Sequence, residues 1–151
     1  MLSKWTPVLM LTILLLLTCR VVCNIYSLSF CQCEDSDVSC LGEGKEVLEL
    51  SFSSLPSSIN ILRLSNLASV TIKTNTFSGQ ENLKKINLQT IEKVVLKKFS
   101  YSTSKVSTNM TYFKMENIKH FSLETGHSLG NFPRSSLVLF KKVGMEVGSK
   151  Y

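Results

Sequence analysis

An apolar phrase recurs along the chain and constrains its fold more than any other feature. Its spacing is apolar-x-apolar-x-x-apolar-x-x-apolar, and its copies begin at Leu62, Ile86 and Phe113. Starts that lie about 25 residues apart fall within the period of roughly 20–50 residues that is typical of a repeat array. Because such arrays stack into extended surfaces that mostly serve for binding, the phrase favours a binding scaffold.

Each copy of the phrase begins with a strand-like alternation. Leu62 and Leu64 alternate with Arg63 and Ser65, as in a strand with one buried face. A second alternation follows within each copy, at 70–72, 94–96 and 121–123, and predicts a second short strand per repeat. The expected fold class is therefore an α/β or mostly β solenoid, a short arc of repeats with a parallel inner sheet.

The N-terminus has the features of a secretory signal peptide. Lys4 supplies a positive charge, and residues 8–17 form an apolar run interrupted only by Thr12, which is too short to span a bilayer comfortably. We assign residues 1–22 to the signal peptide, and cleavage after Cys19 and cleavage after Cys23 both fit. An uncleaved anchor is the competing interpretation. No later run reaches membrane length, so the mature chain is predicted to be secreted, extracellular and without a membrane span.

The cysteines are confined to the N-terminal part of the chain. All 5 of them precede Leu41. Cleavage after Cys19 leaves an even set that can pair completely, whereas cleavage after Cys23 leaves an odd one. A zinc site is the competing interpretation, but a C-x-C step without a nearby histidine suits zinc poorly, and secretion favours disulfides.

The segment that follows resembles the N-terminal cysteine cap of extracellular leucine-rich repeat proteins. The resemblance rests on Cys31-x-Cys33, on Val38-x-Cys40 and on the run Leu55-Pro56-Ser57-Ser58-Ile59. It implies a cap over residues 23–58, repeats over 59–125, and the disulfide pairs Cys23–Cys33 and Cys31–Cys40. The alternation at 47–50 predicts a short strand lying against the first repeat.

The first spacer is also similar to the repeat of that family. The matching residues stand at its F-x5-L-x2-L-x-L spacing and are Phe77, Leu83, Ile86 and Leu88. The family often places asparagine or cysteine at the bend after the strand, where this chain has Leu67, Ile91 and Ile118. The resemblance further implies that the outward strand residues line a concave side.

From Gly126 onward the pattern weakens. Leu137-x-Leu139 follows Phe113-x-Met115 by one repeat length and predicts the inward pair of a fourth strand, although Lys142 stands at the next inward position. Residues 126–151 are therefore assigned to a degenerate last repeat or tail. Whether this strand is a makeshift cap or the chain is a truncated product stays open.

Parallel stacking would place the outward residues of the repeats in three columns. These are Ile61, Lys85 and Tyr112; Arg63, Asn87 and Lys114; and Ser65, Gln89 and Glu116. Tyrosine and arginine tend to carry the energy of interfaces. The candidate ligand-binding residues are Arg63, Lys85, Asn87, Gln89, Tyr112 and Lys114.

The net charge and the short motifs indicate which classes of binding partner are expected. The formal net charge is +6, and the lysines are frequent from Lys84 to Lys119 but spread over several faces, which indicates solubility as readily as a sulfated-glycan site. No nucleic-acid-recognition motif accompanies them. Residues 99–110 predict a surface bulge, and Asn109-Met110-Thr111 within it is an N-glycosylation sequon. No catalytic motif is present and the chain has only 2 histidines, so neither an enzyme nor a cofactor is expected.

The sequence thus predicts an extracellular leucine-rich repeat binding module that recognises a protein, or a glycan, on its concave sheet. The alternative is a structural or assembly protein whose last strand pairs with a partner, or a truncated fragment of a larger leucine-rich repeat protein. Its oligomeric state stays open.

Overall fold

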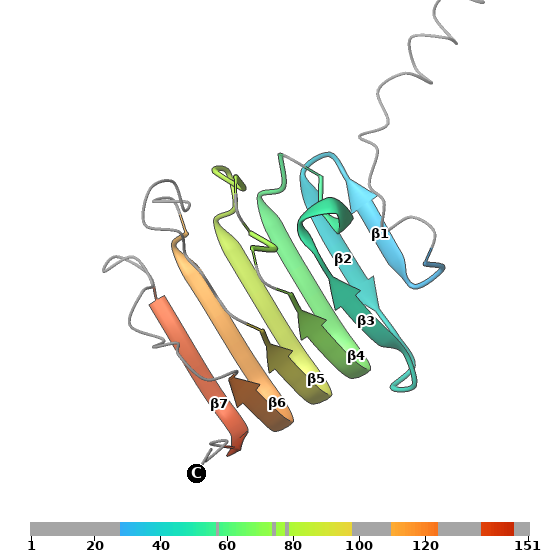
Figure 1. The fold of residues 1–151 in the computed structure, drawn as a ribbon, viewed down its shortest axis with the longest axis vertical. Coiled ribbons are helices and arrows are strands. Elements are labelled where there is room, and N and C mark those ends of the chain that lie inside the picture. Colours follow the sequence, from blue (N-terminus) through green and yellow to red (C-terminus); the bar gives the residue numbers. More distant parts are fainter. Residues whose placement is uncertain are drawn as a thin grey trace, which may run out of the picture.

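Long parallel strands built from the recurring phrase dominate the computed structural model (Figure 1). The structure describes residues 28–56, 58–73, 75–77, 79–97, 110–123 and 137–146. Its repeat strands are stacked in chain order and are β4 (Ile61–Ile72), β5 (Lys85–Leu96), β6 (Tyr112–Leu123) and β7 (Leu137–Glu146). The predicted fold class is confirmed, because the chain is a mostly β, parallel-sheet solenoid with an N-terminal disulfide.

The core consists of columns of apolar side chains, one from each strand. Five positions of β4 are buried, and they are Leu62, Leu64, Leu67, Val70 and Ile72. The register stacks each of them on its equivalent, so that Leu62 lies beside Ile86 and Ile86 beside Phe113. Each repeat therefore covers the apolar face of its neighbour, which is why the phrase recurs with so little change.

Each long strand bends in its middle at a residue with left-handed backbone geometry. The residues are Asn66, Thr90, Asn117 and Lys142, with φ values of 54°, 53°, 55° and 53°. They occupy equivalent positions, because the register pairs the residues on either side of them. Asparagine adopts this conformation more readily than other residues with a side chain.

The bend lies one residue before the position at which the family often places asparagine or cysteine. Leu67, Ile91 and Ile118 belong to the apolar phrase and are buried core residues, as the phrase predicted. The bend lies immediately before them, where Asn66 and Asn117 supply the residue type that the resemblance implied.

A disulfide-bonded hairpin begins the sheet. β1 (Cys31–Glu34) pairs antiparallel with β2 (Asp37–Leu41), and the Cys31–Cys40 bond joins residues that face each other in the register. Cys33 is also disulfide-bonded. Its predicted partner, Cys23, lies outside the described residues, as do the signal peptide and both predicted cleavage points.

The cap is itself a repeat whose strand is divided in two. β2 pairs with the first half of β4, where Val38 faces Leu62, and β3 (Val47–Leu50) pairs with the second half, where Leu48 faces Val70. The sequence predicted the β3 contact but not the part played by β2. The cap therefore covers the first repeat with the same pattern of buried positions that the repeats use.

The loop that divides this strand passes close to the bend of β4. Asn66 Nδ2 donates a hydrogen bond to the Gly42 carbonyl at 2.8 Å. A Cβ atom on residue 42 would lie 2.7 Å from Leu67 Cδ2 and 2.8 Å from Asn66 O, so this close approach requires glycine.

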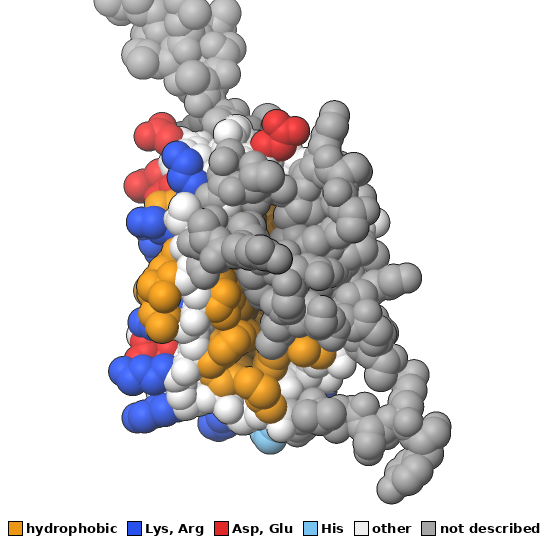
Figure 2. Space-filling model, turned by 90° about the vertical axis from the view of Figure 1, so that its left-hand side faces the viewer, with side chains coloured by type: hydrophobic (Ala, Val, Ile, Leu, Met, Phe, Trp, Pro, Cys, Tyr) orange, Lys and Arg blue, Asp and Glu red, His pale blue; other side chains and the backbone are white. Residues whose placement is uncertain are grey.

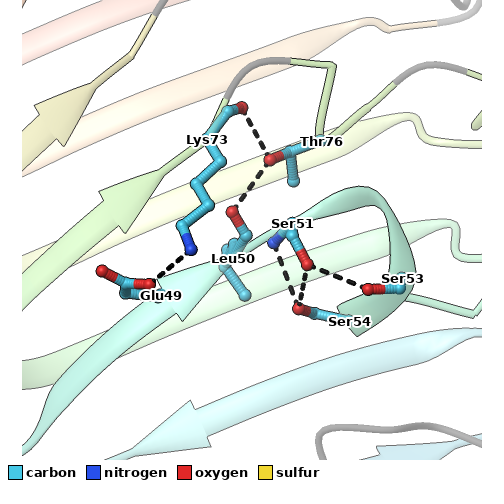
Figure 3. A network of polar contacts seen from close by, with 7 residues as sticks. All are labelled: Glu49, Leu50, Ser51, Ser53, Ser54, Lys73 and Thr76. Carbon is cyan, nitrogen blue, oxygen red and sulfur yellow. Dashed lines mark hydrogen bonds and ion pairs between the residues drawn. The ribbon is translucent and has the colours of Figure 1, made fainter.

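A polar network ties the cap to the first spacer (Figure 3). Ser51 follows β3 and its backbone N–H donates to Ser54 Oγ of the short 3-10 helix η2 (Phe52–Ser54). The buried Thr76 hydroxyl lies 2.9 Å from Leu50 O and 2.7 Å from Lys73 O, so its proton has an acceptor on either side. Lys73 Nζ also meets Glu49 Oε2 at 2.6 Å. These contacts fix the start of the spacer that leads to β5.

Strand β7 continues the solenoid in a register that differs from the predicted one. Val138 faces Phe113, Phe140 faces Met115 and Val143 faces Ile118, while Lys142 forms the bend. The predicted inward pair, Leu137 and Leu139, points outward and is exposed. The run 137–140 is apolar throughout, so its alternation did not distinguish the two faces.

The spacers differ in how much of them the structure describes. The matching residues of the first spacer, Phe77 and Leu83, are buried as the resemblance implied. Met110 is 1% exposed, so the end of the predicted 99–110 surface bulge belongs to the core, whereas Asn109 lies outside the described residues. Across the described ranges, no helix is long and apolar enough to cross a membrane.

Candidate ligand-binding surface

The predicted columns of outward residues are present on the half of the sheet that precedes the bend. We call this the first outer face; it comprises the outward residues of 61–65, 85–89, 112–116 and 137–141. The register aligns Ile61, Lys85 and Tyr112 in one column and Arg63, Asn87 and Lys114 in the next. The face therefore brings together all six candidate residues, which are Arg63, Lys85, Asn87, Gln89, Tyr112 and Lys114.

An ion pair with the cap occupies one margin of this face. Arg63 Nη1 lies 3.0 Å from Asp37 Oδ2, and both side chains are partly exposed. Their strands are neighbours in the register, since Asp37 faces Ile61. A pair of this kind contributes little stability, but it balances the Arg63 charge within the molecule.

A tighter ionic cluster occupies the other margin. Glu116 accepts from Lys114 Nζ at 2.5 Å and from Lys141 Nζ at 2.8 Å, and its side chain is only 12% exposed. The hydrogen bond from Lys114, followed by that from Lys141, lowers the pKa of Glu116 to about 2. The same hydrogen bond raises the pKa of Lys114, so both groups are charged at neutral pH.

Between the two ionic margins lies β5, whose outward charged side chain takes part in neither ion pair. Lys85 and Gln89 are exposed on β5, and no ion pair involves Lys85 within the described ranges. Sequence reasoning placed Glu116 in a column without recognising its role. Its position two residues after Lys114, on the same strand face, was the available signal.

Asn87 lies at the centre of the face with an unmatched polar atom. It stands between Arg63 and Lys114 in the register. Its Oδ1 is inaccessible to solvent and has no hydrogen-bond partner. An unsatisfied buried polar group costs about 1–3 kcal/mol, so this oxygen lowers the stability of the sheet at the centre of the face.

The half of the sheet that follows the bend presents a different surface. This second outer face comprises the outward residues of 69–71, 93–95 and 120–122, and its columns include Ser69, Lys93 and His120. Lys119 Nζ and Glu92 Oε1 are 3.7 Å apart beside it, and both are exposed. The lysines are thus divided between the two faces, and the face residues form no continuous basic patch.

Metal-binding geometry does not occur in the part of the chain that the structure describes. No group of three or more histidine, cysteine, aspartate or glutamate side chains is placed there so that it could hold a metal ion. The first outer face offers hydrogen-bonding groups, an aromatic ring and cations, which are means of recognition.

Comparisons with known protein families, with curated proteins and with solved structures found no match. The structure by itself shows a short β-solenoid that begins with the Cys31–Cys40 disulfide, which is compatible with a cysteine-capped repeat protein.

Proposed function

We propose that the protein is an extracellular binding module of the leucine-rich repeat type, which recognises a protein ligand through its first outer face. The observation that carries the proposal is the alignment of polar and aromatic side chains from three neighbouring strands on one outer face, with the exposed Lys85 and Gln89 between its two ionic margins. The exposed Lys85 and Gln89 would offer hydrogen bonds to polar groups of the ligand, while Tyr112 would supply apolar contact area.

The ion pairs of the face indicate which ligand chemistry suits it. Asp37 balances Arg63, and Glu116 balances Lys114 and part of the charge of Lys141. Sulfated glycans are bound through cations that are available to the sulfates. Since two candidate cations already have carboxylate partners, the face favours a hydrogen-bonding protein surface over a sulfated glycan.

Extracellular location is supported by two features of the chain. Residues 1–22 have the pattern of a signal peptide, and the described cysteines Cys31, Cys33 and Cys40 are disulfide-bonded. We expect a glycan at Asn109 in protein made by eukaryotic cells. Enzymatic removal of N-glycans should lower the mass, and an unchanged mass would refute the glycan.

Affinity capture from extracellular fluid tests the proposed face. The variant Lys85→Ala, Asn87→Ala and Gln89→Ala changes β5 and leaves every described ion pair intact, unlike substitution of Arg63 or Lys114. Its matched control is Thr71→Ala, Lys93→Ala and Ser122→Ala on the second outer face.

We expect the first variant to lose its partners and the control to keep them. Interface hot spots cost more than about 2 kcal/mol each, so binding should fall by at least tenfold. Retention of all partners by the β5 variant would contradict the proposal. The single substitution Tyr112→Ala then tests the contribution of the aromatic side chain separately.

A role in assembly is the second candidate, and the exposed apolar side chains of β7 favour it. Light scattering over a range of concentrations separates the two roles. A monomer at all concentrations counts against self-assembly.

A further inference from the structure

Strand β7 forms one end of the sheet (Figure 1). It pairs with β6, and no described strand pairs with its other edge. An edge of this kind presents backbone N–H and C=O groups that can pair with an added strand.

The side chains of β7 leave part of the core open at this end. Phe140 is 36% exposed and Met145 is 57% exposed, whereas their neighbours in the same columns of β6, Met115 and Phe121, are buried. The Phe140 ring still contacts the Phe121 ring at a centroid distance of 6.4 Å. Hydrophobic side chains accordingly show on this end of the molecule (Figure 2). Among the described residues, no further strand covers the inward columns at this end, where Phe140 and Met145 are exposed and Val138 and Val143 are partly buried.

Two lysines stand between the apolar pairs of this strand. Lys141 and Lys142 are exposed and separate Val138 and Phe140 from Val143 and Met145. Lys141 already pairs with Glu116 of the preceding strand at 2.8 Å. A carboxylate on the next strand would continue this alternation of charge.

We propose that β7 accepts an extended segment of a partner protein, one that carries acidic residues between two apolar pairs. The apolar residues would lie opposite Val138, Phe140, Val143 and Met145, and the acidic residues opposite Lys141 and Lys142. The inward apolar residues of β7 have the same spacing in either chain direction. A partner segment with one sequence pattern could therefore pair with β7 in a parallel or an antiparallel orientation. This surface is independent of the first outer face, and the inference does not depend on the proposed function.

Charge disfavours the β7 strand of a second copy as the occupant. An antiparallel pairing of two β7 strands that matched their apolar residues would place Lys141 of one copy opposite Lys142 of the other. Like charges directly opposite each other destabilise a strand pair. The same lysines would attract an acidic segment, so they select between the two occupants.

Peptide titration against the full-length, disulfide-bonded protein tests the proposal. The probe is a fluorescent ten-residue peptide with leucine at the four apolar positions, glutamate at the two central positions and threonine elsewhere. Its matched control replaces both glutamates with lysine. We expect the acidic peptide to bind roughly tenfold more tightly at low salt, and the preference to shrink as salt is added.

Charge reversal on the protein locates the site. The variant Lys141→Glu and Lys142→Glu should prefer the lysine peptide, and Lys142→Glu alone, which keeps the Lys141–Glu116 pair, should reduce the preference. The control variant Lys93→Glu and Lys97→Glu, away from β7, should leave the preference for the acidic peptide unchanged. Equal affinity for the two peptides, no binding at millimolar concentration, an unchanged preference after reversal, or a dimer of the unmodified protein would each overturn the proposal.

Discussion

Thr90 occupies a backbone position that suits its side chain poorly. Its φ of 53° matches the φ of 54° at Asn66 and 55° at Asn117, where asparagine stands at the same bend. Left-handed geometry costs about 1–2 kcal/mol for most residues, and asparagine reduces this cost through local hydrogen bonds. A β-branched residue such as threonine has the least freedom to adapt there.

Thr90→Asn should therefore stabilise the protein by about 1 kcal/mol. The measurement is the free energy of unfolding from urea titration. Thr71→Asn is the control, because Thr71 lies in the extended part of β4, where asparagine fits less well than threonine. If the two substitutions have the same effect, the bend is not strained at Thr90.

The bend shows what residue-level reasoning could and could not predict. The buried apolar positions of β4, β5 and β6 followed from periodicity alone. Asn66 and Asn117 carried a readable signal for left-handed geometry, yet the family spacing directed attention one residue further along. Thr90 and Lys142 carry no such signal, and only the register with their neighbours places them at the bend.

At the scale of single elements, the Glu116 cluster links β6 to β7. The pKa of Glu116 lies at about 2, below its ordinary value of 4.5, so the folded state binds fewer protons than the unfolded state between these values. The contribution of Glu116 is therefore complete above about pH 4.5 and is lost as the pH falls toward 2.

Glu116→Gln should lower the thermal unfolding temperature at pH 7, and the difference from the unmodified protein should shrink as the pH falls toward 2. Thermal scans of both proteins across this range check the prediction. Glu92→Gln is the control, because its exposed carboxylate lies 3.7 Å from Lys119 and such pairs contribute little. A difference that stays constant with pH would assign the effect to packing instead of charge.

The β1–β2 hairpin should depend strongly on its disulfide. Cys31 and Cys40 are both buried, and a bond that closes a loop of this kind contributes roughly 2–4 kcal/mol. Cys31→Ala combined with Cys40→Ala should reduce the free energy of unfolding by that amount, as measured in urea. Under reducing conditions the difference between this variant and the unmodified protein should narrow, and a difference that persists in full would count against the bond as its source.

Element-level prediction failed where the sequence offered two equivalent solutions. For β7, both Leu137 with Leu139 and Val138 with Phe140 could serve as the inward pair, and the structure uses the second. For the cap, Val38-x-Cys40 supported only the resemblance to a cysteine cap, and no strand was predicted there. Its pairing with β4 depends on the loop at Gly42, whose close approach to Asn66 involves residues distant in sequence.

At the scale of the whole molecule, the described repeat strands pair only with the neighbouring repeat and, at β4, with the cap strands β2 and β3. Stability in such arrays is nearly a sum of repeat and interface contributions, so it should decline toward an uncovered end. The buried Leu88 of β5 and the partly exposed Phe140 of β7 occupy the same inward column. Substitution of Leu88 therefore tests an interior repeat, and substitution of Phe140 tests the last described strand.

Leu88→Ala should cost about 2–5 kcal/mol and accelerate amide hydrogen exchange throughout β4, β5 and β6. Phe140→Ala should cost less and accelerate exchange chiefly in β7, because its side chain is already 36% exposed. Hydrogen exchange followed by mass spectrometry, with peptides from each strand, distinguishes the two patterns. Uniform acceleration by both substitutions would show that the solenoid unfolds as a single unit.

The order of the strands also bears on how the protein is made. The Cys31–Cys40 hairpin closes over a sequence separation of 9, and every later repeat strand pairs with the strand delivered before it. Domains generally fold from the N-terminus during synthesis, at about 5–20 residues per second. The direction of translation therefore coincides with the direction in which the solenoid grows, because each repeat packs on one that was synthesised before it.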